Sequence, residues 1–174
     1  LYENDYEHFI NMINRLEQSG AITNNSTKMT IMIDASGVAN RELFVENLSR
    51  VESSKGNLIQ KSLGLDEPRI IDTSNFEEEN VITFDKFKSA VEENELNSFV
   101  QLSQAITNYT DKKNLIKKDA SQQENEKFTF RTWLVRIGMI GDEYKYARKK
   151  FQQNLEGNSA WLHGKVEMTT SDIE

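Results

Sequence analysis

The sequence FTFRTWLVRIGMIGDEYKYARKKFQQNL, residues 128–155, predicts two helices joined by a tight turn. Apolar side chains recur at helical spacing from Phe128 to Ile137, and Gly138 stands where this helix should end. Asp142 is predicted to cap a second helix that continues to Gly157. Two helices joined by so few residues must pack as an angled pair, which predicts a helix-turn-helix-like unit. Its predicted structural residues are Trp133, Gly138, Gly141 and Tyr144.

The surface of this unit is predicted to be basic. Residues 112–165 have a net charge of +6, whereas residues 66–111 have a net charge of -8. Lysine and arginine neutralise phosphates without reading sequence, so the unit is a candidate for binding a polyanion. The cations concerned are Arg131, Arg136, Lys145, Arg148, Lys149 and Lys150. The alternatives are a solvated helix face, or acidic and basic parts that neutralise each other across the fold.

Aromatic residues alternate with these cations, a pattern typical of proteins that stack on unpaired bases. They are Phe128, Phe130, Trp133, Tyr144 and Tyr146. The alternative is that Phe128, Trp133 and Tyr144 belong to the core. We favour the core for Trp133, because it lies on the apolar stripe of its helix.

The rest of the chain predicts an α+β fold, mostly helical with about five helices and a small antiparallel sheet. Three strands are expected over residues 28–35, 69–73 and 80–84, the last two forming a hairpin around an acidic connection, Asn75 to Asn80. Further helices are expected between Asp5 and Gly20, from the Asn40 cap to Gly64, and from Glu92 to Tyr109.

Three regions follow from this pattern. Residues 1–111 form an α+β part with the acidic hairpin and a helix, residues 112–125 a polar linker, and residues 126–174 a basic helical part with an acidic tail. Because the chain begins at Leu1, we expect it to start inside a longer product.

Several classes of function are excluded by composition. The chain has 174 residues, no cysteine and two histidines, which excludes disulfides, thiolate metal sites and a cysteine nucleophile. No phosphate loop, calcium loop or hydrolase motif is present, so we expect no independent enzyme, no cofactor and no metal. No apolar run approaches the roughly 20 residues that span a bilayer, so we expect no membrane partner, and the absence of cysteine predicts a location in a reducing cytoplasm.

The stretch from Phe130 to Ala160 resembles a known family. It carries an aromatic-Arg start, two glycines three residues apart, Glu-Tyr-Lys, Ala-Arg-Lys and a closing Ser-Ala. A second match is SKGNLIQKSLG, residues 54–64, and residues 81–87 look like the family's strand before its third helix. These motifs are similar to those of the "virulence-related" proteins carried by plasmids and integrative conjugative elements of Firmicutes.

The resemblance implies a function, because some proteins of this kind are anti-CRISPR inhibitors of the type II RNA-guided effector nuclease. They act at the guide RNA, either blocking its assembly with the nuclease or provoking its truncation. The implied partners are therefore that nuclease and its guide RNA, and guide truncation would depend on the nuclease. Together with the basic helix pair, the resemblance implies three further candidate binding residues, Lys55, Lys61 and Asn158.

Two other functions stay open. One is a DNA- or RNA-binding accessory protein of a mobile genetic element, which would use residues 127–150. The other is a nuclease that cuts RNA directly, although histidine and clustered carboxylates are scarce.

Overall fold

A computed structural model describes residue 15 and residues 28–65, 70–88, 92–117 and 125–160. The helix predicted between Asp5 and Gly20 therefore lies outside the described residues, apart from Arg15. The elements, in chain order, are β1 (Lys28–Asp34), α2 (Arg41–Leu63), β2 (Ile71–Asp72), α3 (Phe76–Glu79), β3 (Val81–Lys88), α4 (Glu93–Asp111), α5 (Glu126–Arg136), the 3-10 helix η1 (Asp142–Tyr144) and α6 (Lys145–Phe151). The α+β prediction is confirmed.

The three strands form one antiparallel sheet in the order β1-β3-β2. The predicted hairpin is confirmed, with α3 inside its acidic connection. β3 is longer than predicted and bulged: Ile31 pairs with Phe84 and Met29 with Phe87, so two residues of β3 face Thr30 alone. One of the two, Lys86, has a φ of 72°.

The long helix α2 begins and ends where the sequence predicts. The Asn40 side chain accepts a hydrogen bond from the Leu43 N–H at 3.1 Å, which caps the first turn. At the other end Gly64 has a φ of 62°, a left-handed conformation that glycine adopts without a Cβ penalty. The helix continues without interruption through Gly56.

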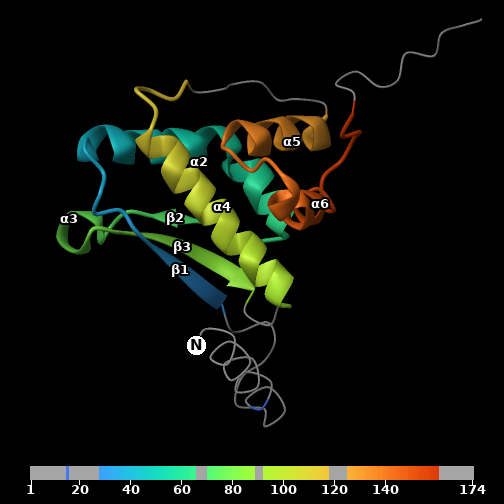
Figure 1. Ribbon diagram of the computed structural model, residues 1–174, viewed down its shortest axis with the longest axis horizontal. Coiled ribbons are helices and arrows are strands. Elements are labelled where there is room, and N and C mark those ends of the chain that lie inside the picture. The colour runs from blue at the N-terminus through green and yellow to red at the C-terminus, as the bar shows by residue number, and fades with distance from the viewer. Residues whose placement is uncertain (1–14, 16–27, 66–69, 89–91, 118–124, 161–174) are drawn as a thin grey trace, which may run out of the picture.

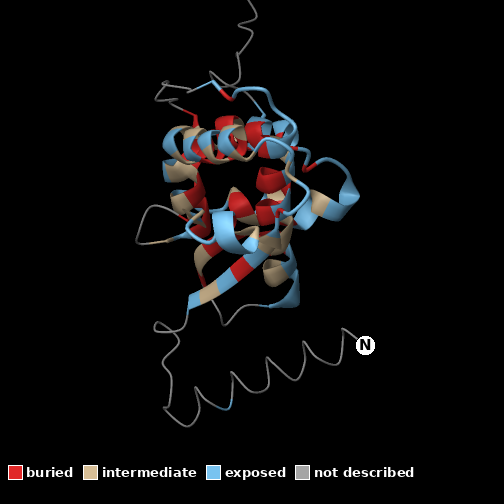
Figure 2. Cartoon of the chain, turned by 90° about the vertical axis from the view of Figure 1, so that its left-hand side faces the viewer, coloured by how far each residue is buried: buried red, intermediate tan, exposed pale blue. Residues whose placement is uncertain are grey.

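One hydrophobic core joins the sheet to the helices (Figures 1 and 2). Phe87 of β3 stacks on Phe99 of α4 at 4.7 Å between ring centroids, and Phe99 stacks on Phe151 of α6 at 6.5 Å. In Figure 1 α4 crosses diagonally in front of α2, and α5 and α6 lie on the side away from α3. The core therefore includes residues from both sides of the predicted linker.

The C-terminal pair differs from the prediction in its second helix. α5 ends at Arg136, close to the predicted Gly138, but Asp142 makes no side-chain cap and begins a 3-10 turn. The α-helix that follows ends at Phe151, so its predicted extension to Gly157 is wrong. The reason is tertiary: the chain turns after Phe151, and Leu155 is buried in the core, 3% exposed.

None of the helices in the described part of the chain combines the length and the apolar character that crossing a bilayer requires.

Candidate nucleic-acid interface

A groove of about 480 Å³ lies where α2, the C-terminal end of α4 and α5 meet. We call it the α2–α5 groove. It is lined by Val51, Ser54, Lys55, Tyr109, Lys113, Leu115, Ile116, Lys117, Trp133 and Arg136. The groove thus unites Lys55 and Arg136, two candidate binding residues that are far apart in the sequence.

A buried asparagine positions one wall of this groove. Asn47 of α2 is fully buried, and its side-chain amide donates to the carbonyl oxygens of Thr110 at 3.1 Å and Lys113 at 3.0 Å. Its Oδ1 accepts from the Ile116 N–H at 2.8 Å. Residues 112–117, the first part of the predicted linker, are therefore anchored to α2 at these points. Residues 118–124 lie outside the described residues.

The lining of the α2–α5 groove is basic. Four of its residues are cations, and none of its described lining residues is acidic. Lys113 Nζ lies 5.3 Å from the centroid of the Tyr109 ring, a cation–π arrangement. Lys117 and Arg136 are exposed, while Lys55 is only 8% exposed. Such a groove can neutralise phosphates, and Tyr109 adds an aromatic side chain to its lining.

A second basic hollow, the α5–α6 groove, has a volume of about 590 Å³. It is lined by Lys127, Arg131, Lys149, Gln152, Gln153, Ser159 and Ala160. Arg131 Nη1 donates to the Ser159 carbonyl oxygen at 3.0 Å, which fixes the guanidinium at the edge of the hollow. Arg131 and Lys149, both candidate binding residues, are thereby brought together.

Three other candidate binding residues make structural contacts. Lys61 Nζ lies 2.9 Å from a carboxylate oxygen of Glu126 and 3.2 Å from one of Glu156. Arg148 donates to the Met139 carbonyl oxygen at 2.8 Å, across the turn between α5 and α6. Lys150 Nζ lies 3.1 Å from Glu95 of α4. These contacts give the three cations partners within the protein.

The remaining candidate binding residues, Lys145 and Asn158, are exposed and line neither groove. Asn158 Oδ1 accepts from the Ala160 N–H at 2.7 Å, a local turn contact. Trp133 is 4% exposed and packs against Phe130, with 5.4 Å between ring centroids.

The predicted structural residues of the turn lie between α5 and α6. Gly138 and Gly141 have φ values of 98° and 100°, which a β-carbon disfavours. Tyr144 is half-buried and packs against the core.

Sequence reasoning missed several residues of the two grooves. The sequence pattern places Tyr109 on a helix face and Lys113 and Lys117 in a polar linker. It assigns no role to Lys127. The signal that could have found the lysines is their arrangement as Lys112-Lys113 and Lys117-Lys118 within an otherwise uncharged or acidic segment. Asn47, which anchors the wall, gives no local signal because its partners lie more than 60 residues away.

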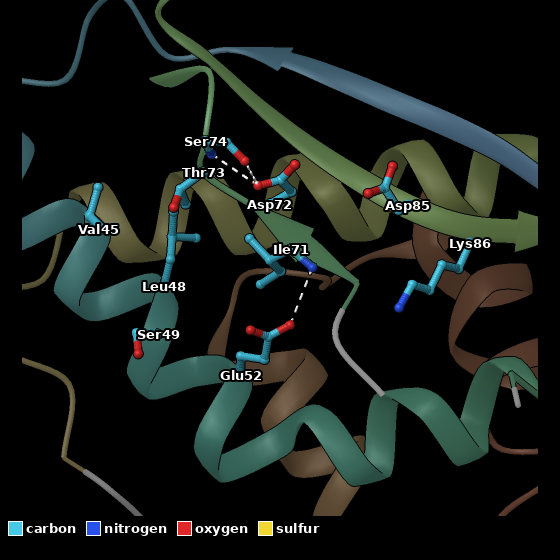
Figure 3. A pocket seen from close by; sticks show the side chains of 10 residues that line it. All are labelled: Val45, Leu48, Ser49, Glu52, Ile71, Asp72, Thr73, Ser74, Asp85 and Lys86. Atoms are coloured by element: carbon cyan, nitrogen blue, oxygen red, sulfur yellow. Dashed lines mark hydrogen bonds between the residues drawn. The ribbon is translucent and has the colours of Figure 1, made fainter. Parts of the chain in front are cut away.

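A third hollow, of about 570 Å³, lies between α2 and the β2–β3 hairpin (Figure 3). Its three carboxylates each accept a hydrogen bond: Glu52 from the Ile71 N–H at 3.3 Å, Asp72 from Ser74, and Asp85 from Thr30 at 3.0 Å. The Ser74 hydroxyl and N–H lower the pKa of Asp72, which makes it a weak base. An acidic hollow repels polyanions, so it does not compete with the basic grooves as an RNA site.

Among the described residues, no three or more histidine, aspartate or glutamate side chains are placed so that they could hold a metal ion. Both histidines, His8 and His163, lie outside the described residues.

The Lys61 cluster predicts a pH dependence of stability. Hydrogen bonds with Glu126 and then Glu156 raise the pKa of Lys61. Burial alone would raise the pKa of Glu126, but the Glu156 N–H and Lys61 outweigh it and lower that pKa. The stability that the charged Glu126 contributes is therefore fully present at pH values above the ordinary glutamate pKa of 4.5, and it is lost as the pH falls through the lowered pKa. The stability that the charged Lys61 contributes is fully present at pH values below the ordinary lysine pKa of 10.5, and it is lost as the pH rises through the raised pKa.

We therefore expect Glu126→Gln to lower the melting temperature at pH 7 and to have a much smaller effect at pH 3. Thermal denaturation followed by circular dichroism measures both differences. An equal effect of the substitution at the two pH values would contradict the assigned role of the Glu126 charge.

Comparison of the chain with protein-family models, with curated proteins and with solved structures finds no match.

Proposed function

We propose that this protein inhibits a type II RNA-guided nuclease by binding its guide RNA through the α2–α5 groove. The observation that carries the proposal is the convergence of Lys55, Lys113, Lys117 and Arg136 on one groove beside Tyr109. The type of nuclease and RNA comes from the resemblance of residues 54–64 and 130–160 to the "virulence-related" family.

The chemistry of the groove is suited to RNA in two ways. Each cation that displaces counterions from a phosphate contributes to affinity, and it makes that affinity depend on salt. Tyr109 is half-buried, so its ring is held in place while one part of it stays accessible to a base. The acidic remainder of the chain, with a net charge of -8 over residues 66–111, restricts polyanion contacts to the basic side.

The second candidate is a nucleic-acid-binding accessory protein of a mobile genetic element. The same groove serves this function, because phosphate contacts do not by themselves distinguish DNA from RNA. The two functions differ in whether nuclease activity changes when the protein is added.

The binding step is tested by reversing three exposed charges of the groove, Lys113→Glu, Lys117→Glu and Arg136→Glu together. Guide-RNA affinity, measured by fluorescence anisotropy, should fall at least 100-fold. The slope of log affinity against log salt should become shallower by about 2 to 3, because up to three phosphate contacts are lost.

The matched control is Lys28→Glu. Lys28 is exposed on β1, pairs with Lys88 of β3 in the sheet, and lines neither basic groove. RNA affinity of the control variant should stay within about twofold of wild type. Equal losses in the triple variant and the control would contradict the groove.

The inhibitory step is tested by DNA-cleavage assays in which the protein is added before guide RNA, after guide RNA or after target DNA. The guide is examined on a denaturing gel. Inhibition that disappears after guide loading indicates competition for assembly, and a shortened guide seen only with nuclease present indicates provoked truncation. Normal cleavage in every order, across several type II nucleases, would favour the accessory-protein function.

A further inference from the structure

Helix α5 lies between the two basic grooves. Lys127 and Arg131 line the α5–α6 groove, whereas Trp133 and Arg136 line the α2–α5 groove. At about 100° per residue, Arg136 is about 140° around the helix axis from Arg131 and about 180° from Lys127. The cations therefore lie on two opposite flanks of one helix, at an outer edge of the molecule (Figure 1).

Between these flanks α5 has an uncharged outer face. Thr132 is exposed, Val135 is 41% exposed, and Phe128 is half-buried. The opposite side of the helix packs into the core through Phe130 and Leu134, both fully buried. We call the outer face, Phe128, Thr132 and Val135, the α5 ridge. The helix thus presents an uncharged ridge with a row of cations on each side.

Each flank is built from more than one element. Lys149 of α6 joins Lys127 and Arg131 on one side. On the other side, Lys113 and Lys117 from the segment after α4 join Arg136. The Arg131–Ser159 hydrogen bond and the Asn47 contacts hold parts of the two flanks in fixed positions.

We infer that the RNA bound by this protein is double-stranded where it meets α5, with the backbone of one strand at each groove and the α5 ridge over the minor groove between them. This inference rests on the proposed function and specifies its ligand. A helix with its side chains is about 10–12 Å across, so the two flanks are separated by about that distance. A duplex offers two phosphate backbones on either side of a groove, whereas a single strand offers one.

The chemistry of the ridge agrees with this arrangement. Duplex RNA is recognised mostly by its shape, through phosphate and 2′-hydroxyl contacts across a wide and shallow minor groove. The Thr132 hydroxyl can exchange hydrogen bonds with 2′-hydroxyl groups, and Val135 can pack against ribose. No charged residue lies on the ridge, so nothing there repels the sugar surface or competes with the flanking phosphates.

The test compares three probes of one sequence: a 20-base-pair RNA duplex, its single-stranded RNA and the corresponding DNA duplex. Two double variants are used, Lys127→Ala with Arg131→Ala for one flank and Lys113→Ala with Arg136→Ala for the other. We expect each pair to weaken binding of duplex RNA about tenfold and the four substitutions together about 100-fold. Single-stranded RNA should respond only to the Lys113 and Arg136 pair.

A third variant, Val135→Glu, tests the ridge without removing a cation. Val135 is exposed, so the fold should be retained, and circular dichroism checks this. The new carboxylate should weaken duplex RNA binding at least tenfold and leave single-stranded RNA binding within about twofold of wild type.

Three outcomes would overturn the inference. They are unchanged duplex affinity in the Lys127 and Arg131 pair, equal losses on duplex and single-stranded RNA, or tighter binding of the DNA duplex. If only the Lys113 and Arg136 pair matters, on both RNA probes, the duplex inference fails while the proposed RNA-binding function stands. If neither RNA probe binds wild-type protein, the proposed function fails as well.

Discussion

Replacing Asn47 by leucine should lower the free energy of unfolding by about 3 kcal/mol or more, because each buried polar group left without a partner costs about 1–3 kcal/mol. Leucine has the same number and branching of side-chain heavy atoms as asparagine, so the substitution removes hydrogen bonds rather than volume. The Ile116 N–H and the Thr110 and Lys113 carbonyl oxygens would all lose their contact with Asn47. Urea denaturation measures the change.

The same variant links stability to the binding site. Without Asn47 the segment carrying Lys113 and Lys117 loses its hydrogen bonds to that side chain and keeps the one from Arg50 to the Ile116 carbonyl oxygen, so the α2–α5 groove should lose part of its defined shape. We expect RNA affinity to fall about tenfold under conditions in which the variant is still folded. The matched control is Asn108→Leu, at an exposed position of α4, which should change stability by no more than about 0.5 kcal/mol. Similar urea midpoints for the two variants would contradict the anchoring role of Asn47.

Replacing Gly157 by valine is expected to cost about 3 kcal/mol, combining left-handed backbone strain with loss of a helix cap. Gly157 has a φ of 94°, and a β-carbon there would lie 2.9 Å from Asn125 Cγ and 3.3 Å from Asn125 Cα. Asn125 is buried and caps α5, its Oδ1 accepting from the Phe128 N–H at 3.1 Å. Valine would therefore strain its own backbone and displace the cap of α5.

The other glycines of the C-terminal part provide an internal comparison. At Gly138 a β-carbon would meet nothing within 4 Å, so only the strain of its positive φ remains. At Gly141 the nearest atoms belong to the flexible Glu143 side chain, which can move away. Valine at either position should lower the free energy of unfolding less than valine at Gly157 does. Each substitution should still cost more than the roughly 1 kcal/mol of a typical point mutation. Melting temperatures in any other order would show that contact with Asn125 is not the dominant effect.

The sequence alone was sufficient for elements whose ends and faces are determined locally. α2 is an example, because the Asn40 cap, the apolar stripe from Phe44 to Leu63 and the left-handed Gly64 all lie within the helix or next to it. The hairpin of β2 and β3 was predictable for the same reason. Its two short apolar segments, Ile70-Ile71 and Val81 to Phe84, are bounded by polar residues and are close in sequence.

Local patterns failed where a distant contact decides the conformation. The polar composition of residues 112–125 predicts a linker and gives no sign that Asn47, 69 residues before Ile116, holds residues 113 and 116 by hydrogen bonds. The helix predicted to reach Gly157 ends at Phe151, because burial of Leu155 favours a turn over a further helical turn. The bulge at Lys86 likewise has no glycine to signal its positive φ.

The candidate site shows the same division. The sequence by itself determined that the C-terminal part is basic and that its aromatic residues alternate with cations. Only the tertiary structure decided which cations face outward: Lys150 meets Glu95 of α4 and Lys61 meets Glu126 and Glu156, whereas Arg136 lies in a groove with Lys113 and Lys117. The physical reason is that a charge count gives the sign of a segment, while the partner of each charge depends on which helices pack together.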